Sequence, residues 1–159
     1  MQLVIDRYPV HAPPEIVADF HYRPDALRRL TPPPVIVQAR GIQPLGEGSH
    51  SEFTLWFGPL PVRWLAHHVR VNRSEGFTDV QEQGPFLHWE HTHAWRADGP
   101  NLTEMTEMVR YEHHPGWKGL LTRLLFAPPM LRLMFAYRRR VIRQACEPKQ
   151  AMPVLLQHN

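Results

Sequence analysis

The stretch "GFTDVQEQGPFLHWEHTHAW", from Gly76 to Trp95, holds two strand-length segments on either side of the pair Gly84–Pro85. A break this short, made of turn-forming residues, joins neighbouring antiparallel strands. Successive side chains of a strand point to opposite faces, so one face of the second segment carries a row of bulky amphipathic side chains. These are Trp89, His91, His93 and Trp95. The stretch therefore predicts two paired strands, one of which has a face suited to lining a pocket.

The same pattern extends in both directions. From residue 35 to residue 114, six strand-length segments are separated by short breaks rich in glycine and proline, which predicts an antiparallel meander. The segments are "VIVQARGI", "SHSEFTLWFG", "VRWLAHHVRVN", "FTDVQEQ", "PFLHWEHTHAWR" and "NLTEMTEMVRYEH". The N-terminal "QLVIDRYPVHA" alternates imperfectly and adds a seventh strand.

Helical periodicity appears at both ends of this strand region. "PPEIVADFHY" and "RPDALRRL" carry proline where a helix begins, and they predict two short helices after the first strand, the first with an apolar stripe of Ile16, Val17 and Phe20. "WKGLLTRLLFA" and "MLRLMFAYRRRVIRQA" are helical near the C-terminus. On the last segment one face comprises Leu131, Met134, Phe135, Arg138, Val141, Ile142 and Ala145. We therefore expect a long C-terminal helix that packs on the sheet.

The composition sets the broad class. The chain of 159 residues, 43% hydrophobic and 21% charged, is typical of a single globular domain, which we assign to residues 1–146, with 147–159 as a frayed tail. The single cysteine, Cys146, allows no intrachain disulfide, and the N-terminus has no secretory signal pattern, so we expect a cytoplasmic protein. Arg132 and the pair Pro128–Pro129 interrupt the most apolar stretch, so we expect a soluble one.

The net charge of +3 comes largely from "YRRRVIR", with four arginines between Tyr137 and Arg143. A solvated helix face explains this run. Nucleic-acid binding would require basic residues interleaved with exposed stacking aromatics or a known motif, and the sequence has neither, so we expect no nucleic-acid partner.

Several motifs, in this order and spacing, resemble the START-like superfamily, also called SRPBCC, and within it the bacterial ligand-binding proteins grouped with polyketide cyclases and dehydrases. They are "LRRLTPP", "GEGS", "FTLWFGPLP", "GFTDVQEQGPFLHWEHTH" and "FAYRRR". The resemblance covers about residues 1–145. It implies an α+β helix-grip fold, with a curved seven-stranded antiparallel sheet wrapped around a long C-terminal helix. It also implies a cavity for an apolar or aromatic small molecule, but no particular reaction.

Candidate ligand-binding residues come from strand faces with many aromatic or amphipathic side chains and from the C-terminal helix. They are Phe53, Leu55, Phe57, Trp64, His68, Phe77, Asp79, Gln81, Trp89, His91, His93, Trp95, Tyr111, Phe135 and Arg138. Ordinary core packing is the alternative for most of the aromatic ones, because aromatic residues dominate cores. A single bulge would reverse which face of a strand meets the cavity.

Arg138 occupies the centre of an apolar helix stripe, where a leucine is expected. One hypothesis is that it turns into the cavity and meets Asp79, Glu107 or a ligand carboxylate or phenolate. The alternative is that its stem lies on the core while its guanidinium reaches the surface.

A metal site is an alternative use of His91 and His93, since residues i and i+2 of a strand can present two imidazoles to one ion. A third ligand would have to come from His67, His68, His113 or a carboxylate such as Asp79. An isolated H-x-H pair in a chain with 11 histidines is weak support, so we expect no metal and no cofactor. The histidines can also be core residues bonded to backbone carbonyls.

Three functions remain open. A carrier or sensor for a small apolar, aromatic or lipid-like ligand requires the least of the sequence and is favoured. A polyketide cyclase or dehydrase would use His91 or His93 as general acid or base, with Asp79 or Arg138 orienting the substrate. The basic, apolar C-terminal helix can also contact an anionic membrane transiently, although the fold commits its apolar face to the core. The expected oligomeric state is a monomer or a homodimer.

Overall fold

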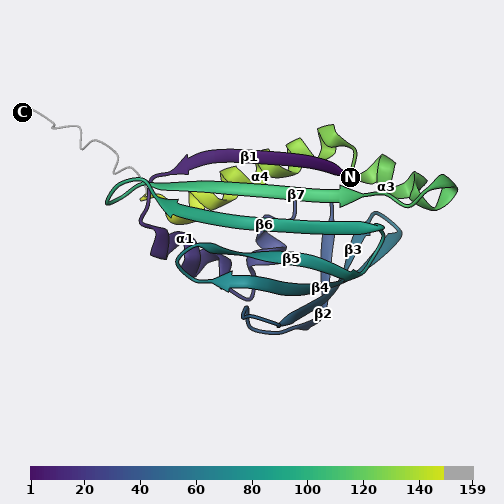
Figure 1. The fold of residues 1–159 in the computed structure, drawn as a ribbon, viewed down its shortest axis with the longest axis horizontal. Coiled ribbons are helices and arrows are strands. Elements are labelled where there is room, and N and C mark those ends of the chain that lie inside the picture. Colours follow the sequence, from purple (N-terminus) through teal and green to yellow (C-terminus); the bar gives the residue numbers. More distant parts are fainter. Residues whose placement is uncertain (149–159) are drawn as a thin grey trace, which may run out of the picture.

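The computed structural model describes residues 1–148 and contains one antiparallel sheet, two short N-terminal helices and a C-terminal helical segment (Figure 1). From residue 149 onward, the predicted frayed tail lies outside the described residues. The strands are β1 (Gln2–Val10), β2 (Ile36–Ile42), β3 (His50–Phe57), β4 (Leu60–Asn72), β5 (Gly76–Gln83), β6 (His88–Ala97) and β7 (Thr103–Glu112). The helices are α1 (Pro14–His21), α2 (Ala26–Leu30), the 3₁₀ helix η1 (Gly116–Gly119), α3 (Leu120–Leu125) and α4 (Pro128–Cys146).

The seven strands form a single sheet in the order β1-β7-β6-β5-β4-β3-β2. The strands β2 to β7 follow one another as a meander, and β1 joins by pairing antiparallel with β7, so that segments from opposite ends of the chain lie side by side (Figure 1). This is the predicted α+β helix-grip arrangement, and the prediction is confirmed.

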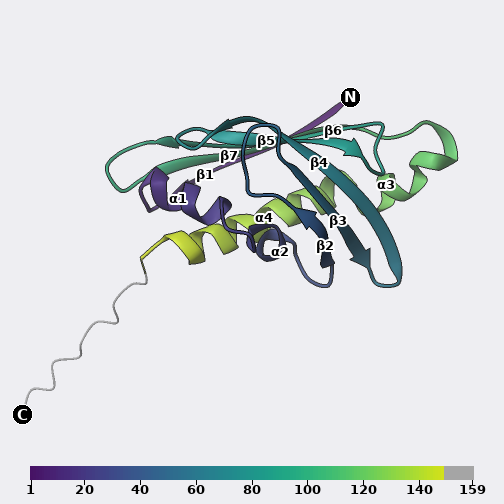
Figure 2. The ribbon, with the colours of Figure 1, turned by 90° about the horizontal axis from the view of Figure 1, so that it is seen from below.

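The sheet curves around α4 (Figure 2). The pairing register shifts between Ala39 and Gly41 in β2 and at two places in β4, next to Leu65 and next to Val69. Such irregularities bend a strand and increase its twist. The bends lie in the β2–β4 half of the sheet, which folds over toward α4 (Figure 2).

The long helix α4 begins at Pro128, whose fixed φ angle suits a first helical position. Its buried side chains are those of Leu131, Phe135, Arg138, Ile142 and Cys146. The predicted stripe is correct except at its end, where Ala145 is exposed and Cys146 takes the inward position. A helix turns 100° per residue, so the facing row drifts by one position over five turns.

The first helix needs a similar correction. In α1 the buried residues are Val17, Ala18, Phe20 and His21, whereas Ile16 of the predicted stripe is exposed. The inward face of this helix therefore carries a histidine.

The stretch Gly116–Cys146 is long and apolar enough, by length and composition, to cross a membrane. Its best 18-residue window has a mean hydropathy of 1.2 and is only 28% buried. This corrects the expectation that the fold commits the apolar face of the whole segment to the core. One face of α4 is buried, but in η1 and α3 only Gly119 and Thr122 are buried and most apolar side chains are exposed.

Candidate functional site: a cavity between the sheet and the C-terminal helix

A cavity of about 700 Å³ lies between the concave face of the sheet and α4. Residues 30–35, which follow α2, and residues 42–45, which follow β2, form part of its wall. A volume of this size is typical of sites for drug-sized organic ligands.

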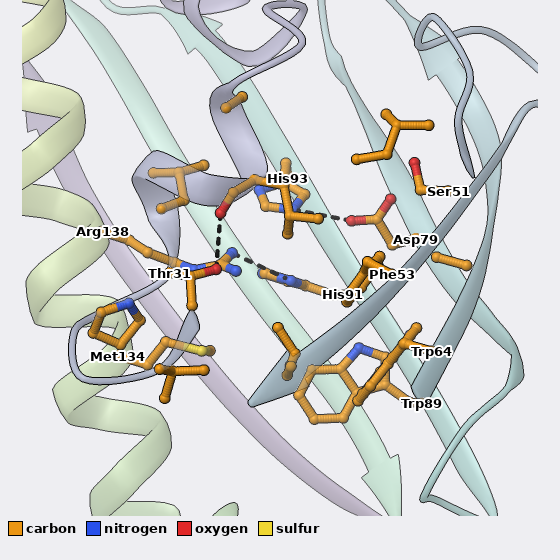
Figure 3. Close-up of a pocket in the computed structure, with 18 of the residues that line it drawn as sticks. Thr31, Ser51, Phe53, Trp64, Asp79, Trp89, His91, His93, Met134 and Arg138 are labelled. Atoms are coloured by element: carbon orange, nitrogen blue, oxygen red, sulfur yellow. Dashed lines mark hydrogen bonds and ion pairs between the residues drawn. The ribbon is translucent and has the colours of Figure 1, made fainter. Parts of the chain in front are cut away.

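One side of the cavity is aromatic. The rings of Phe53 and Trp64 stack with their centroids 6.1 Å apart, and Trp64 meets Trp89 edge to face at 5.3 Å. Met134 of α4 faces this wall across the cavity (Figure 3). Phe53 on β3 and Trp64 on β4 are direct cross-strand partners, and β6, two strands away from β4, supplies Trp89.

A polar cluster of His68, Asp79 and His93 lies beside this wall (Figure 3). His68 Nε2 lies 3.1 Å from Asp79 Oδ1, and His93 Nε2 lies 3.4 Å from Asp79 Oδ2. His68 Nδ1 lies 2.9 Å from the carbonyl oxygen of Ser49. Both nitrogens of His68 therefore face acceptors, which only the doubly protonated imidazolium satisfies.

A second cluster surrounds Glu107, whose side chain is 0% exposed. Its carboxylate accepts hydrogen bonds from Tyr8 at 3.2 Å, from His91 Nε2 at 3.2 Å and from Arg138 Nη1 at 3.3 Å. Arg138 Nη1 also lies 3.5 Å from His91 Nδ1. Of the two alternatives for Arg138, the structure contains the inward one, with Glu107 as partner, and its guanidinium does not reach the surface.

The ionisation of the two carboxylates follows from their partners. Burial alone would raise the pKa of Asp79, but the hydrogen bonds of His68 and His93 outweigh it and hold the pKa well below its usual range. Burial opposes the charge of Glu107 in the same way, and His91 together with Arg138 lowers its pKa far more. Both groups are therefore anionic at neutral pH.

The imidazoles divide into one charged and three neutral groups. Burial disfavours the charge on His68, yet Asp79 raises its pKa above the usual value. Burial lowers the pKa of His21 and of His93 to about 4, and it also lowers the pKa of His91. With His68 and Arg138 positive and the two carboxylates negative, the cavity wall is charge-balanced.

Four polar atoms of this wall have no hydrogen-bond partner among residues 1–148: His21 Nε2, Asp79 Oδ1, His93 Nδ1 and Arg138 Nε; the contact of Asp79 Oδ1 with His68 is an ion pair. His21 Nδ1 donates to the Val17 carbonyl at 2.8 Å, so its Nε2 carries a lone pair. The rings of His21 and His93 lie 5.6 Å apart.

The structure brings most of the predicted ligand-binding residues to the cavity. Those on its wall are Phe53, Leu55, Phe57, Trp64, His68, Phe77, Asp79, Trp89, His91, His93 and Arg138. Their contact with a ligand stays a prediction.

Four predicted residues lie off the cavity wall. Gln81 bonds the backbone of Phe86 through both side-chain amide atoms, and Trp95 donates from Nε1 to the Arg73 carbonyl. Tyr111 and Phe135 are buried in the core. They share strand or helix faces with wall residues, but each sits where a neighbouring element covers that face.

Sequence reasoning did not list His21, Thr31, Ser51 or Met134 as ligand-binding, although all four line the cavity. The short helix α1 brings in His21, and the residue after α2 is Thr31; no periodic pattern signals these two. Ser51 lies on β3, and its alternation with Phe53 and Leu55 was a signal that could have found it. Glu107 had a detectable signal, because it lies between Met105 and Val109 on a buried strand face, where a carboxylate needs a partner.

Among residues 1–148, the side chains could hold a metal ion in one place. Asp79, His91 and His93 each offer a ligand atom, and these atoms lie within 4.8 Å of one another. However, Glu107 and Asp79 already hold the Nε2 atoms of the two histidines, and Arg138 places a positive charge 3.5 Å from His91 Nδ1. These residues do not suit a divalent cation.

Comparison with solved structures gives matches over nearly the whole chain. A protein from Chromobacterium violaceum matches with a TM-score of 0.73 and 12% identity, covering 94% of this chain and 100% of its own. An aromatase/cyclase from Streptomyces sp. R1128 matches with a TM-score of 0.62 and 16% identity, covering 91% of this chain and 90% of its own. A nucleoside-diphosphate sugar epimerase from Corynebacterium glutamicum matches with a TM-score of 0.65 and 26% identity, covering 89% of this chain but only 28% of the epimerase.

No protein-family model matches the chain, and a comparison with curated protein sequences gives no match. The similar solved structures are START-like (SRPBCC, Bet v1-like) proteins, and the resemblance stated from the sequence is confirmed at the level of the fold. The chain thus has the helix-grip fold.

Proposed function

We propose that this protein binds a small, mainly apolar or aromatic ligand in the cavity between the sheet and α4, as a carrier or sensor. The supporting observation is a cavity of about 700 Å³ whose wall is largely aromatic and aliphatic, with its buried charged groups gathered around Asp79 and around Arg138. Removing an apolar ligand from water contributes about 25 cal/mol per Å² before the costs of association. The proposal includes that this chain is a soluble bacterial protein of the ligand-binding branch that it resembles.

The polar cluster indicates what the ligand carries. The Asp79 side chain is 25% exposed and lines the cavity, whereas Glu107 and Arg138 bind each other. A ligand therefore meets the Asp79 carboxylate as an acceptor, whereas Glu107 holds Arg138 through Nη1 and leaves only the Nε–H without a partner. We expect a ligand with a hydroxyl or phenol group, and exclusion of ligands whose polar group is a carboxylate.

The first test is native mass spectrometry of freshly purified protein, followed by denaturation and extraction of the same sample. A co-purifying organic molecule with an apolar body and a hydroxyl group supports the proposal. A co-purifying molecule whose only polar group is a carboxylate contradicts the assignment of Asp79.

A matched set of probes tests the cavity directly through quenching of tryptophan fluorescence. We expect 2-naphthol to bind about tenfold more tightly than 2-methoxynaphthalene, which lacks the donor, and 2-naphthoate to bind more weakly than both. Asp79→Asn should reduce the discrimination against naphthoate, whereas Glu82→Gln, on the same strand but outside the cavity, should not. Failure of all three probes to bind would contradict the proposal.

A second candidate function is catalysis of the cyclase or dehydrase type, and the Asp79–His93 pair favours it. A neutral imidazole oriented by a carboxylate in a water-poor site is the arrangement of a general base. If the protein is an enzyme, a bound ligand changes mass on incubation with wild type, and His93→Gln binds the same ligand without converting it. A carrier returns its ligand unchanged in both cases.

A further inference from the structure

The segment η1–α3 and the start of α4 carry an exposed apolar surface, which we call the rim patch. It comprises Trp117, Leu120, Leu121, Leu124, Met130 and Leu133. Trp117 is 82% exposed, Leu124 is 72% exposed and Leu120 is 67% exposed. Trp117, Leu120 and Leu124 follow the i, i+3, i+7 spacing of one helix face, so their side chains act together.

The rim patch is continuous with the mouth of the cavity. Leu124, Met130 and Leu133 line the cavity and are at the same time exposed to solvent. The α3 helix lies at one end of the molecule, where the chain turns from β7 into α4 (Figures 1 and 2). A surface that covers the patch therefore also covers the entrance for an apolar ligand.

The charges around the rim patch have one sign. Lys118, Arg123 and Arg132 are exposed among its apolar residues. The sequence contains no aspartate or glutamate between Glu112 and Glu147. An apolar surface with a tryptophan, surrounded by cations and free of anions, is complementary to the headgroup region of an anionic bilayer.

We propose that the rim patch docks on anionic lipid bilayers, with Trp117 and Leu120 inserted among the headgroups and the cavity entrance facing the membrane. The sequence suggested the basic C-terminal helix as the contact, but three arginines of that helix have partners in the core sheet: Arg138 binds Glu107, Arg139 lies 3.7 Å from Asp6, and Arg143 donates to the Pro9 carbonyl. Arg123 also donates to carbonyls, those of Gly116 and His114, but these belong to η1 and the residues before it, so its charge stays at the patch. Docking uses η1 and α3 instead. Transfer of a ligand through this contact rests on the proposed function, but docking itself does not.

The test is flotation of the full chain with two kinds of vesicle, pure phosphatidylcholine and phosphatidylcholine mixed with phosphatidylglycerol. Wild type should bind the anionic vesicles and be released by high salt, because salt screens the three cations. The double variant Trp117→Ala/Leu120→Gln removes two inserting side chains that do not line the cavity, and it should lower vesicle partitioning about tenfold or more. Leu3→Gln, at an exposed apolar site on β1 outside the rim patch, should leave partitioning unchanged.

Naphthol binding, measured in parallel, separates the two proposals. Loss of vesicle binding in the double variant with intact naphthol binding supports docking by the rim patch. Naphthol binding without any vesicle binding by wild type overturns the docking proposal and leaves the proposed function standing. A wild-type dimer that the double variant abolishes, together with no vesicle binding, would assign the patch to a second copy of the chain and also overturn it.

Discussion

At the scale of single residues, the Glu107–Arg138 pair explains why an arginine occupies the apolar stripe of α4. The carboxylate is fully buried and receives three hydrogen bonds, so the ion pair is satisfied within the core. A buried ion pair whose hydrogen bonds are all made contributes little net stability. Removal of one partner is strongly destabilising, because the other charge then stays buried without a partner.

Glu107→Leu should therefore lower the free energy of unfolding by about 3–5 kcal/mol, because it leaves the Arg138 charge buried without a partner. Glu107→Leu/Arg138→Met should recover a large part of this loss, since both charges are removed. Urea unfolding of the single and double variants measures the coupling. Additive losses would show that the two side chains act independently.

The neutral histidines predict how stability depends on pH. His21 and His93 have a pKa of about 4 in the folded protein, whereas an unfolded imidazole titrates near pH 6.5. Between these values the unfolded chain binds more protons, so acid favours unfolding. The free energy of unfolding should be about 2–4 kcal/mol lower at pH 5 than at pH 7.

His91, whose pKa burial also lowers, adds to this loss of stability, whereas the remaining ionisable groups of the cavity act mainly outside this window. His68, whose pKa is raised, contributes stability that is complete below pH 6.5 and is lost as pH rises through its folded pKa, whereas Asp79 and Glu107 lose theirs only below about pH 4. Urea titrations at the two pH values test the slope. His93→Gln should flatten it, whereas His67→Gln, on the outer face of β4, should not; equal stability of wild type at both pH values would refute the prediction.

At the scale of elements, Gly76 shows how tightly β5 and β6 pair next to the site. Its φ is +135°, and a Cβ atom there would lie 1.9 Å from the carbonyl oxygen of His93. Only glycine allows both the backbone conformation and this close approach. The start of β5 thus fixes the position of a cavity histidine on β6.

Gly76→Ala should lower the free energy of unfolding by about 2 kcal/mol or more, through backbone strain and displacement of β6. Gly41→Ala is the matched control, because its Cβ would meet nothing within 4 Å, and it should change stability by about 0.5 kcal/mol at most. Thermal unfolding of both variants gives the comparison. A Gly76→Ala protein as stable as the control would show that the strands can separate at no cost.

At the scale of the whole molecule, the charge balance of the cavity predicts that no metal is retained. Two carboxylates already face one imidazolium and one guanidinium, so a divalent ion would add uncompensated charge to a buried site. Elemental analysis of protein purified without chelators should find far less than one zinc per chain, and added zinc should not raise the melting temperature. One tightly held equivalent, lost in His93→Ala but kept in His67→Ala, would reverse this conclusion.

The sequence by itself determined the strands, the helices and their order. The alternation of apolar and polar side chains on β6 and the 3.6-residue period of apolar side chains on α4 are local properties of the chain. Each pattern predicts which face of its element is buried. The same periodicity located the row Trp89, His91 and His93, and it singled out Arg138 as anomalous.

Only the tertiary structure decided which of these side chains meet. The pairing of Arg138 with Glu107, rather than with Asp79, depends on how α4 crosses β7, a relation between segments about 30 residues apart that no local period encodes. His21 lines the cavity although it was not predicted to, and Trp95, which was predicted to line it, does not. The reason is that α1 packs His21 against Trp95, so that the histidine faces the cavity in its place. Whether an apolar side chain is buried depends on which distant segments pack against it. The exposure of the rim patch therefore follows from the tertiary structure around η1 and α3 and not from the local sequence.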